Sequence, residues 1–295
     1  MTIGFIGLGR MGKNMVLNLL EHRIPVVAYN REPDAVKDVA HYGARPAFFL
    51  EELVTLLPKQ KIIWLMITAG KPVDTVIQQL LPQLRPGDIV IDGGNSLYTD
   101  SQRRANALKK KGITFLDVGT SGGISGARHG ACMMVGGDKQ AYKKTEFLYK
   151  VMCVKGGYEY MGRSGAGHFV KMVHNGIEYG MMGAIAEGLQ AIGQHSKSLG
   201  MDLNRVAQVY AHGSIIESRL MSWASSGLKR SDLKQISGSV PPGETEAEMR
   251  HLEKIARMPI LRKARECRVE SRTKPTFAGK LIALMRNEFG GHLLN

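Results

Sequence analysis

The chain of 295 residues is long enough for two domains with a substantial core, and its composition, 43% hydrophobic and 22% charged, is that of an ordinary globular protein. No apolar stretch reaches the roughly 18 to 20 residues that a membrane span needs, and three cysteines without metal-ligand spacing argue against a disulfide framework or a metal site. The net charge of +14 permits nucleic-acid binding but fits an enzyme with anionic ligands equally well.

The first 120 residues alternate short β-branched runs with segments of helical period. The runs TIGFIG, PVVAYN, KIIWLM, DIVIDGG and ITFLDVG predict buried strands, each followed by a helix. CMMVGGD (132–138) predicts a further strand, with a helix to about residue 151 and a short strand near 158–161 after it. This order is typical of an α/β domain with a Rossmann-like, doubly wound parallel sheet.

The first strand leads directly into a glycine turn. GFIGLGRMG places Gly7, Gly9 and Gly12 as G-x-G-x-x-G at the head of a helix, with Arg10 and Met11 between them. The first glycine allows a tight turn, the second lets a pyrophosphate approach the backbone, and the third lets helix pack on strand. The helix N-terminus then faces the phosphate charge, so the sequence predicts a dinucleotide site.

The second strand ends in YNREPDAV, where the two nicotinamide dinucleotides are normally distinguished. Asn30 and Arg31 favour the 2′-phosphate of NADP, whereas the adjacent Glu32 would repel that phosphate. The residues therefore predict a nicotinamide dinucleotide, NAD or NADP, without deciding which.

Two later strands also end in glycine-rich turns. IDGGNS contains Asn95, whose amide both donates and accepts hydrogen bonds, and GTSGGISGARHG contains Ser121, Gly122 and Gly123. Backbone amides in such a turn suit a carboxylate or phosphate. Because ligands of doubly wound sheets bind at the carboxyl ends of the strands, the two turns predict one edge of a crevice.

From Ser164 onward the period of the sequence is helical. Ser164 is expected to cap a long helix that runs past residue 191 towards residue 199, followed by helices near 202–211, 215–226, 245–268 and 276–288. We therefore expect a dinucleotide-binding domain over 1–163 and an all-helical domain over 164–295.

The long helix carries one polar stripe on an otherwise apolar segment, GAGHFVKMVHNGIEYG. Lys171, His174, Asn175 and Glu178 lie close together on one face at about 100° per residue. A narrow charged stripe of this kind is either a buried ion pair or the wall of an active site. Burial lowers the pKa of a lysine and raises that of a carboxyl group, so such a pair is suited to general base and general acid chemistry.

These motifs, read together, resemble the decarboxylating 6-phosphogluconate dehydrogenases. The resemblance rests on GLGRMGKN, YNR, DGGNS, SGGISGARHG, GHFVKMVHNGIEYG and the tail LMRNEFGGH, and the length resembles the short-chain branch of that family. It implies oxidative decarboxylation of a phosphorylated sugar acid with hydride transfer to NAD or NADP, without a metal. It also implies a cytoplasmic enzyme that forms a homodimer or a dimer-based oligomer.

The resemblance also implies roles for individual residues. Lys171 would be the general base and Glu178 the general acid, with the dinucleotide held by the glycine turn, Asn30, Arg31 and Asn95. The substrate would be held by the following residues: Asn95, Ser121, Gly122, Gly123, His174, Asn175, Tyr179, Arg286 and His292. In the family the last two reach a partner subunit's site and bind phosphate.

The chain departs from the family pattern at several positions. Glu217 stands where long-chain members have a phosphate-binding arginine, with Arg219 nearby, and an expected tryptophan is missing before an unusually basic segment, 250–274. Glu32 and Ala35 replace residues common in NADP-using members, which favours NAD or mixed use. Two alternatives remain: a β-hydroxyacid dehydrogenase of the 3-hydroxyisobutyrate type, and a non-catalytic dinucleotide- or nucleic-acid-binding module. The basic segment has no aromatic residue for base stacking, which argues against nucleic acid.

Overall fold

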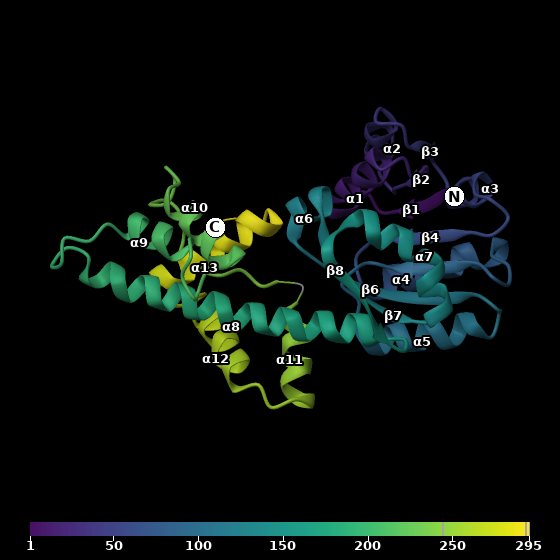
Figure 1. Cartoon of the computed structure of the whole chain (residues 1–295). Helices are drawn as coiled ribbons and strands as arrows, with labels where there is room; N and C mark the ends of the chain where they lie inside the picture. The colour runs from purple at the N-terminus through teal and green to yellow at the C-terminus, as the bar shows by residue number, and fades with distance from the viewer. Residues whose placement is uncertain (244, 293, 295) are drawn as a thin grey trace. The chain divides into compact units, whose positions relative to one another are not determined.

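The computed structural model describes residues 1–243, 245–292 and 294, and the chain forms two compact units, Met1–Lys171 and Met172–Asn295 (Figure 1). The division falls within one long helix, whereas the boundary expected from the sequence lies at residue 163.

Unit 1 is built on one eight-stranded sheet with the order β3-β2-β1-β4-β5-β6-β7-β8. Neighbouring strands are parallel except for β6 and β7, which are antiparallel. The strands are β1 (Ile3–Ile6), β2 (Val26–Tyr29), β3 (Arg45–Ala47), β4 (Ile62–Leu65), β5 (Ile89–Asp92), β6 (Thr114–Ser121), β7 (Ala131–Gly137) and β8 (Cys153–Gly162). Every strand expected from the sequence is present, and the sheet confirms the doubly wound α/β class.

Helices cover both faces of this sheet. One apolar cluster lies between the sheet and α1 (Arg10–Glu21), α2 (Pro33–Ala40), α6 (Gly123–His129) and α7 (Lys139–Met152). A second lies between the other face and α3 (Leu50–Leu56), α4 (Lys71–Leu80) and α5 (Tyr98–Lys109), with a short 3₁₀ turn at Leu81–Gln83. Burial on both faces explains why the strands read as continuous apolar runs rather than as alternating patterns.

Unit 2 is helical in the part that the structure describes. It contains most of α8 (Ala166–His195), then α9 (Leu203–Tyr210), α10 (Arg219–Leu228), α11 (Glu246–Ile255), α12 (Pro259–Glu270) and α13 (Phe277–Gly290). A cluster of apolar residues from α8, α9, α10 and α13 forms its core, with Met182 and Leu284 fully buried.

Two helix predictions in this region are wrong. The single helix expected over 245–268 is two helices, because Pro259 disfavours helical geometry in the residue before it and begins α12. The helix expected from residue 215 begins at Arg219, where the Ser218 hydroxyl accepts the amide of Met221 at 3.1 Å.

Candidate active site

The turn between β1 and α1 is closely packed at two of its glycines. Gly7 has a φ of +100°, and a Cβ there would lie 2.3 Å from the carbonyl oxygen of Met66. A Cβ on Gly12 would lie 2.0 Å from the carbonyl oxygen of Gly7. No larger residue fits at either position, so these glycines are required by the turn itself.

The same turn leaves room for an anion at the head of α1. A Cβ added to Gly9, the N-cap, would meet nothing within 4 Å. No described side chain caps α1, and its first turn, which contains Arg10 and Met11, holds no acidic residue. The head of α1 therefore has space for a phosphate, and the residues fit a dinucleotide pyrophosphate.

The residues after β2 form a small hydrogen-bonded group beside this turn. The side-chain oxygen of Asn30 accepts the amide of Leu8 at 2.9 Å, and its amide donates to the Glu32 carboxylate at 2.8 Å. Nε of Arg31 also donates to Glu32, at 2.9 Å, and this bond is the largest cause of a lowered Glu32 pKa. Glu32 is therefore held in its charged form by Arg31.

The turns after β5 and β6 are joined by hydrogen bonds. Asn95 lies between Asp92 and Ser96, and the Asp92 carboxylate accepts the Ser96 hydroxyl at 2.7 Å. The Thr120 hydroxyl donates to the carbonyl oxygen of Gly93 at 3.5 Å. The structure thus brings Asn95 and the Ser121–Gly122–Gly123 turn to the carboxyl edge of neighbouring strands, as expected.

Helix α8 begins on a buried carboxylate. Asp117 of β6 is fully buried and accepts the amides of Gly165 at 2.7 Å and His168 at 3.0 Å. A cap at Ser164 does not fit a helix that begins at Ala166, because a cap residue directly precedes the first helical residue. The Ser164 hydroxyl donates to the carbonyl oxygen of Ser101 at 3.4 Å. A cap supplied from a different strand cannot be recognised in the local sequence.

Glycines let the start of α8 lie directly against β6. A Cβ on Gly167 would lie 2.4 Å from the carbonyl oxygen of Asp117, and one on Gly119 would lie 2.3 Å from Cβ of Lys171. The root of Lys171 is therefore fixed against the strand that ends at Ser121.

Further along α8, unit 2 gathers aromatic and cationic side chains around Tyr179. The Arg268 guanidinium lies 3.4 Å from the centroid of the Tyr179 ring, and the Tyr179 hydroxyl is 3.0 Å from the hydroxyl of Thr245. Arg286 donates to the carbonyl oxygen of Pro241 at 2.7 Å and is itself buried. Burial, with a smaller contribution from the charge of Arg286, lowers the pKa of Arg268 to about 10.

Arg268 has the character of an anion-binding residue. It is 5% exposed, its Nη2 is 3.3 Å from the sulfur of Met182, and its Nε has no hydrogen-bond partner among the described residues. A buried guanidinium with an unsatisfied nitrogen is costly, and a bound anion would offset part of that cost.

The remaining polar residues of α8 lie within one turn of this cluster. Nδ1 of His174 is 4.0 Å from the Glu178 carboxylate and 3.4 Å from the side-chain oxygen of Asn175. The charge of Glu178 raises the pKa of both Arg268 and Arg286, which places it among these groups. His292 lies at the end of its own α13, with its ring 5.9 Å from that of Phe289.

Sequence reasoning missed Arg268 and Thr245. Arg268 was counted in a basic segment, but Leu261, Ala264 and Arg268 are all buried and are spaced three and four apart, the period of a buried helix face. Glu217, by contrast, is exposed, and its carboxylate accepts the amide of Gly213 at 2.6 Å.

The described residues contain neither a candidate membrane-spanning helix nor a candidate metal site. None of the helices there combines the length and apolar character needed to cross a membrane. In the same part of the chain, no group of three or more His, Cys, Asp or Glu side chains could hold a metal ion.

Known proteins resemble the chain over nearly its whole length. Residues 2–162 match the family model of the NAD binding domain of 6-phosphogluconate dehydrogenase, and residues 167–212 match that of the C-terminal domain. The Bacillus subtilis (strain 168) protein YqeC, whose name places it provisionally among these enzymes, is 43% identical over 99% of the chain and 98% of its own length. A Haloferax volcanii protein named as NAD(+)-dependent, decarboxylating 6-phosphogluconate dehydrogenase is 37% identical, over 99% of the chain and 98% of the relative.

Solved structures agree with this assignment. Plasmodium falciparum 6-phosphogluconate dehydrogenase, described with NADP+ and with 6-phosphogluconate, superposes with a TM-score of 0.83 at 31% identity over 93% of the chain, which spans 62% of that enzyme. Mycobacterium tuberculosis 3-hydroxyisobutyrate dehydrogenase, with a TM-score of 0.74 at 21% identity over 96% of the chain and 98% of its own, shows the shared fold. The chain belongs to the 6-phosphogluconate dehydrogenase family of oxidoreductases and has that family's nicotinamide-dinucleotide-binding domain.

Proposed function

We propose that the protein converts 6-phosphogluconate to ribulose 5-phosphate and CO₂ with hydride transfer to NAD or NADP. The observation that carries the proposal is that Lys171 and Glu178 lie seven residues apart on the continuous helix α8. At about 100° per residue, the two side chains leave the helix in nearly the same direction. A base and an acid on one side of a helix can serve one bound substrate.

Lys171 acts as the general base. Its amine takes the proton of the substrate 3-hydroxyl, and a nicotinamide dinucleotide held by the glycine turn would supply the acceptor for the hydride of C3. The resulting 3-keto acid loses CO₂ because the carbonyl oxygen takes up the electron pair of the broken bond, and the Lys171 ammonium returns its proton to that oxygen to give an enediol. The lysine must be neutral to accept the proton.

Glu178 acts as the general acid. It protonates C1 of the enediol, which gives ribulose 5-phosphate and leaves the carboxylate to be reprotonated. His174, 4.0 Å from that carboxylate, and Asn175 hold hydroxyl groups of the sugar acid, together with Asn95 and the turn at 121–123. These contacts fix C3 and C1 relative to the two side chains of α8.

The Tyr179 cluster binds the substrate phosphate. Arg268 and Arg286 supply two buried positive charges, and the hydroxyls of Tyr179 and Thr245 supply donors. Arg268 takes the phosphate-binding role of the arginine that long-chain members of the family have at the position of Glu217. We further propose that the protein is a homodimer or a dimer-based oligomer, with His292 contributing to phosphate binding.

The cofactor is NAD in preference to NADP. Glu32 keeps its charge and binds Arg31, so a 2′-phosphate would meet a carboxylate rather than a guanidinium. The NAD(+)-dependent name of the Haloferax relative supports this preference.

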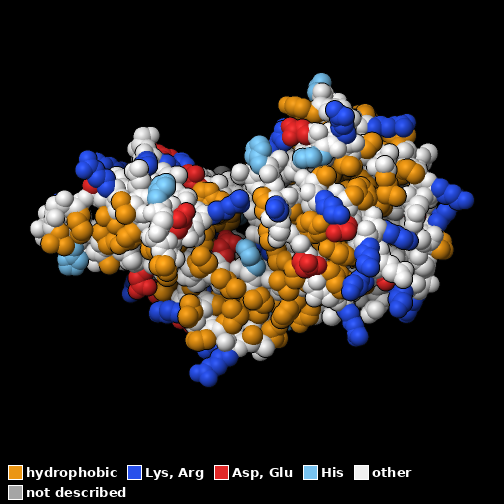
Figure 2. Space-filling view, in the orientation of Figure 1, with side chains coloured by type: hydrophobic (Ala, Val, Ile, Leu, Met, Phe, Trp, Pro, Cys, Tyr) orange, Lys and Arg blue, Asp and Glu red, His pale blue; other side chains and the backbone are white. Residues whose placement is uncertain are grey.

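The two alternative functions, a 3-hydroxyisobutyrate-type dehydrogenase and a non-catalytic dinucleotide- or nucleic-acid-binding module, have less support. A 3-hydroxyisobutyrate substrate has no phosphate, so it would make no use of two buried guanidinium groups, Arg268 and Arg286, beyond those needed for its single carboxylate. For a nucleic-acid module, the basic side chains would form a continuous stripe, whereas on the face shown in Figure 2 they are interspersed with acidic and apolar ones.

The test is a spectrophotometric assay at 340 nm with 6-phosphogluconate and with 3-hydroxyisobutyrate, each with NAD and NADP, while released CO₂ is trapped. We expect activity and CO₂ with the phosphorylated acid alone. Arg268→Met should raise KM for 6-phosphogluconate about 10- to 100-fold. Arg262→Met, an exposed change on the same helix, should not. Reduction of NAD without CO₂ release would contradict the proposal.

A further inference from the structure

We propose that Arg104 is a positioning residue that sets the two ligand-facing loops of unit 1, one containing Asn95 and the other ending at Gly70. The inference rests on the proposed function, because it concerns the same site. Arg104 does not reach the ligand crevice as a binding group. It lies on α5 and is 2% exposed, and its guanidinium is hydrogen-bonded to other groups of the protein.

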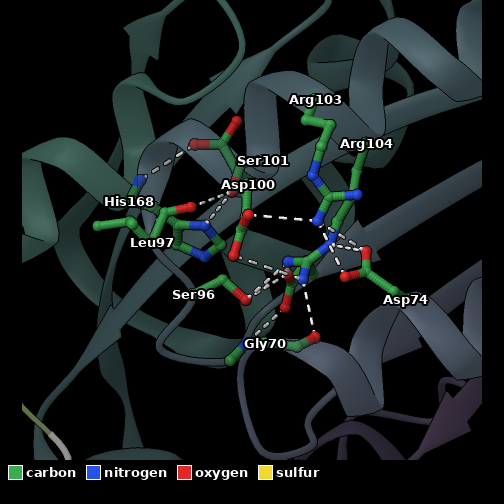
Figure 3. A network of polar contacts seen from close by, with 12 residues as sticks. Gly70, Asp74, Ser96, Leu97, Asp100, Ser101, Arg103, Arg104 and His168 are labelled. Atoms are coloured by element: carbon green, nitrogen blue, oxygen red, sulfur yellow. Dashed lines mark hydrogen bonds and ion pairs between the residues drawn. The ribbon is translucent and has the colours of Figure 1, made fainter.

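Each nitrogen of the Arg104 guanidinium binds a different part of the loops and of α4 (Figure 3). Nε donates to Asp74 at 2.8 Å, and Nη2 donates to the carbonyl oxygen of Gly70 at 2.9 Å. Nη1 donates to Asp92 at 3.3 Å and to the Ser96 hydroxyl at 3.2 Å. One side chain therefore connects the loop after β4 to the loop after β5.

The two loops are the ones that a ligand would meet. They follow adjacent parallel strands, β4 and β5, at the carboxyl edge, where doubly wound sheets bind their ligands. Asp92 and Ser96 flank Asn95, and Asp92 also accepts the amide of Gly94 at 3.1 Å. The backbone on both sides of Asn95 is thus fixed through groups that Arg104 holds.

The same helix also holds the start of α8. The Ser101 hydroxyl is 2.7 Å from Nδ1 of His168 (Figure 3). The Tyr98 ring contacts that of Phe169 with centroids 5.3 Å apart. His168 lies one turn before Lys171 in the sequence. Helix α5 therefore sets both the Asn95 loop and the segment that leads to the proposed base.

A lysine cannot replace Arg104 in this role. A single ammonium group cannot span the acceptors on Asp74, Asp92, Ser96 and Gly70, whereas the planar fork reaches all of them. Arg104→Lys keeps the charge beside the buried Asp92, so it separates geometry from charge. The neighbouring Arg103 offers a matched control, because it is exposed and its partners among the described residues are Asp74 and Asp100.

The experiment compares Arg104→Lys, Arg103→Lys, Asn95→Ala and the double variant Arg104→Lys/Asn95→Ala. For Arg104→Lys we expect a fall in kcat/KM with 6-phosphogluconate of about 10- to 100-fold, with KM raised and kcat lowered. The Tm should also fall, because the lysine leaves buried acceptors unpaired. Arg103→Lys should stay within about twofold of wild type. If Arg104 acts through Asn95, the double variant should be no worse than Asn95→Ala alone.

Two results would overturn the inference: Arg104→Lys with wild-type kinetics, or losses that multiply in the double variant. Should Arg104→Lys fail to fold, Ser96→Ala replaces it in the same cycle, since it removes the hydroxyl between Asp92 and Arg104 and keeps the ion pairs. The dissociation constant of NADH, measured by fluorescence, is determined for every variant. A wild-type protein inactive on 6-phosphogluconate would refute the proposed function. The NADH dissociation constants of the single and double variants would still decide the role of Arg104.

Discussion

Two residues of the proposed site, Lys171 and Tyr179, are held in place by different kinds of contact. Lys171 is fixed by steric contact, since its Cβ lies where a side chain at position 119 would have to be. Tyr179 is fixed by the Arg268 guanidinium over its ring and by the Thr245 hydroxyl. The first arrangement fixes the root of a lysine, and the second places a positive charge against the Tyr179 ring, where we propose that a phosphate binds.

Lys171→Ala should lower kcat roughly 10²- to 10⁴-fold, because the general base acts in the chemical step itself. The NADH dissociation constant and Tm should be close to those of wild type. Lys143→Ala, an exposed change on α7, is the control and should have no effect. Near-normal NADH production by the Lys171 variant would rule out the proposed base.

Glu32→Thr should shift the cofactor preference towards NADP. The change removes a charge that opposes the 2′-phosphate and releases Arg31, so we expect the ratio of kcat/KM for NADP to that for NAD to rise roughly tenfold. Asp34→Thr, which removes an exposed partner of Lys37, is the matched control. An unchanged ratio would remove the basis for preferring NAD.

At the level of elements, the start of α8 depends on β6. Asp117 accepts two amides at the head of the helix, and the glycines at 119 and 167 allow the helix to approach. A shift of this helix end would move Lys171 directly, so the carboxylate contributes to stability and to activity together.

Asp117→Asn should lower the free energy of unfolding by about 1–3 kcal/mol, because an amide group places a donor against one of the two backbone amides. It should also lower kcat. Asp138→Asn, at the exposed N-cap of α7, should cost little, because asparagine caps helices about as well as aspartate. Urea unfolding of both variants measures the difference, and equal values for the two would refute the role of Asp117.

The sequence predicted elements well where a local pattern determines them. The β-branched runs predicted the buried strands, and the glycine spacing predicted the turn at Gly7. β3, only three residues with a proline, carries too little pattern to be recognised. The cap at Asp117 and the packing of Arg268 on Tyr179 depend on residues far apart in the chain, so no local pattern could reveal them.

At the scale of the whole molecule, the family resemblance predicts that the tail serves a partner subunit. In the structure, Arg286 lies in the same unit 2 as Arg268, and their charges interact. We therefore expect Arg286 to complete the phosphate site of its own chain.

Mixing Arg268→Met with Arg286→Met protein after joint unfolding and refolding should not restore activity, because both residues belong to one site of one chain. If Arg286 served a partner instead, random pairing into dimers would leave about a quarter of the sites intact. Refolded wild-type protein is the control for recovery. Activity near that fraction would overturn the expectation.

The continuity of α8 restricts how this chain can change length. One residue inserted between positions 171 and 178 would turn the second side chain by about 100° away from the first. An insertion of seven would restore the common direction but separate the two groups by a further ~10 Å along the axis. Surface loops elsewhere can gain or lose residues at small cost, whereas this stretch of helix tolerates neither.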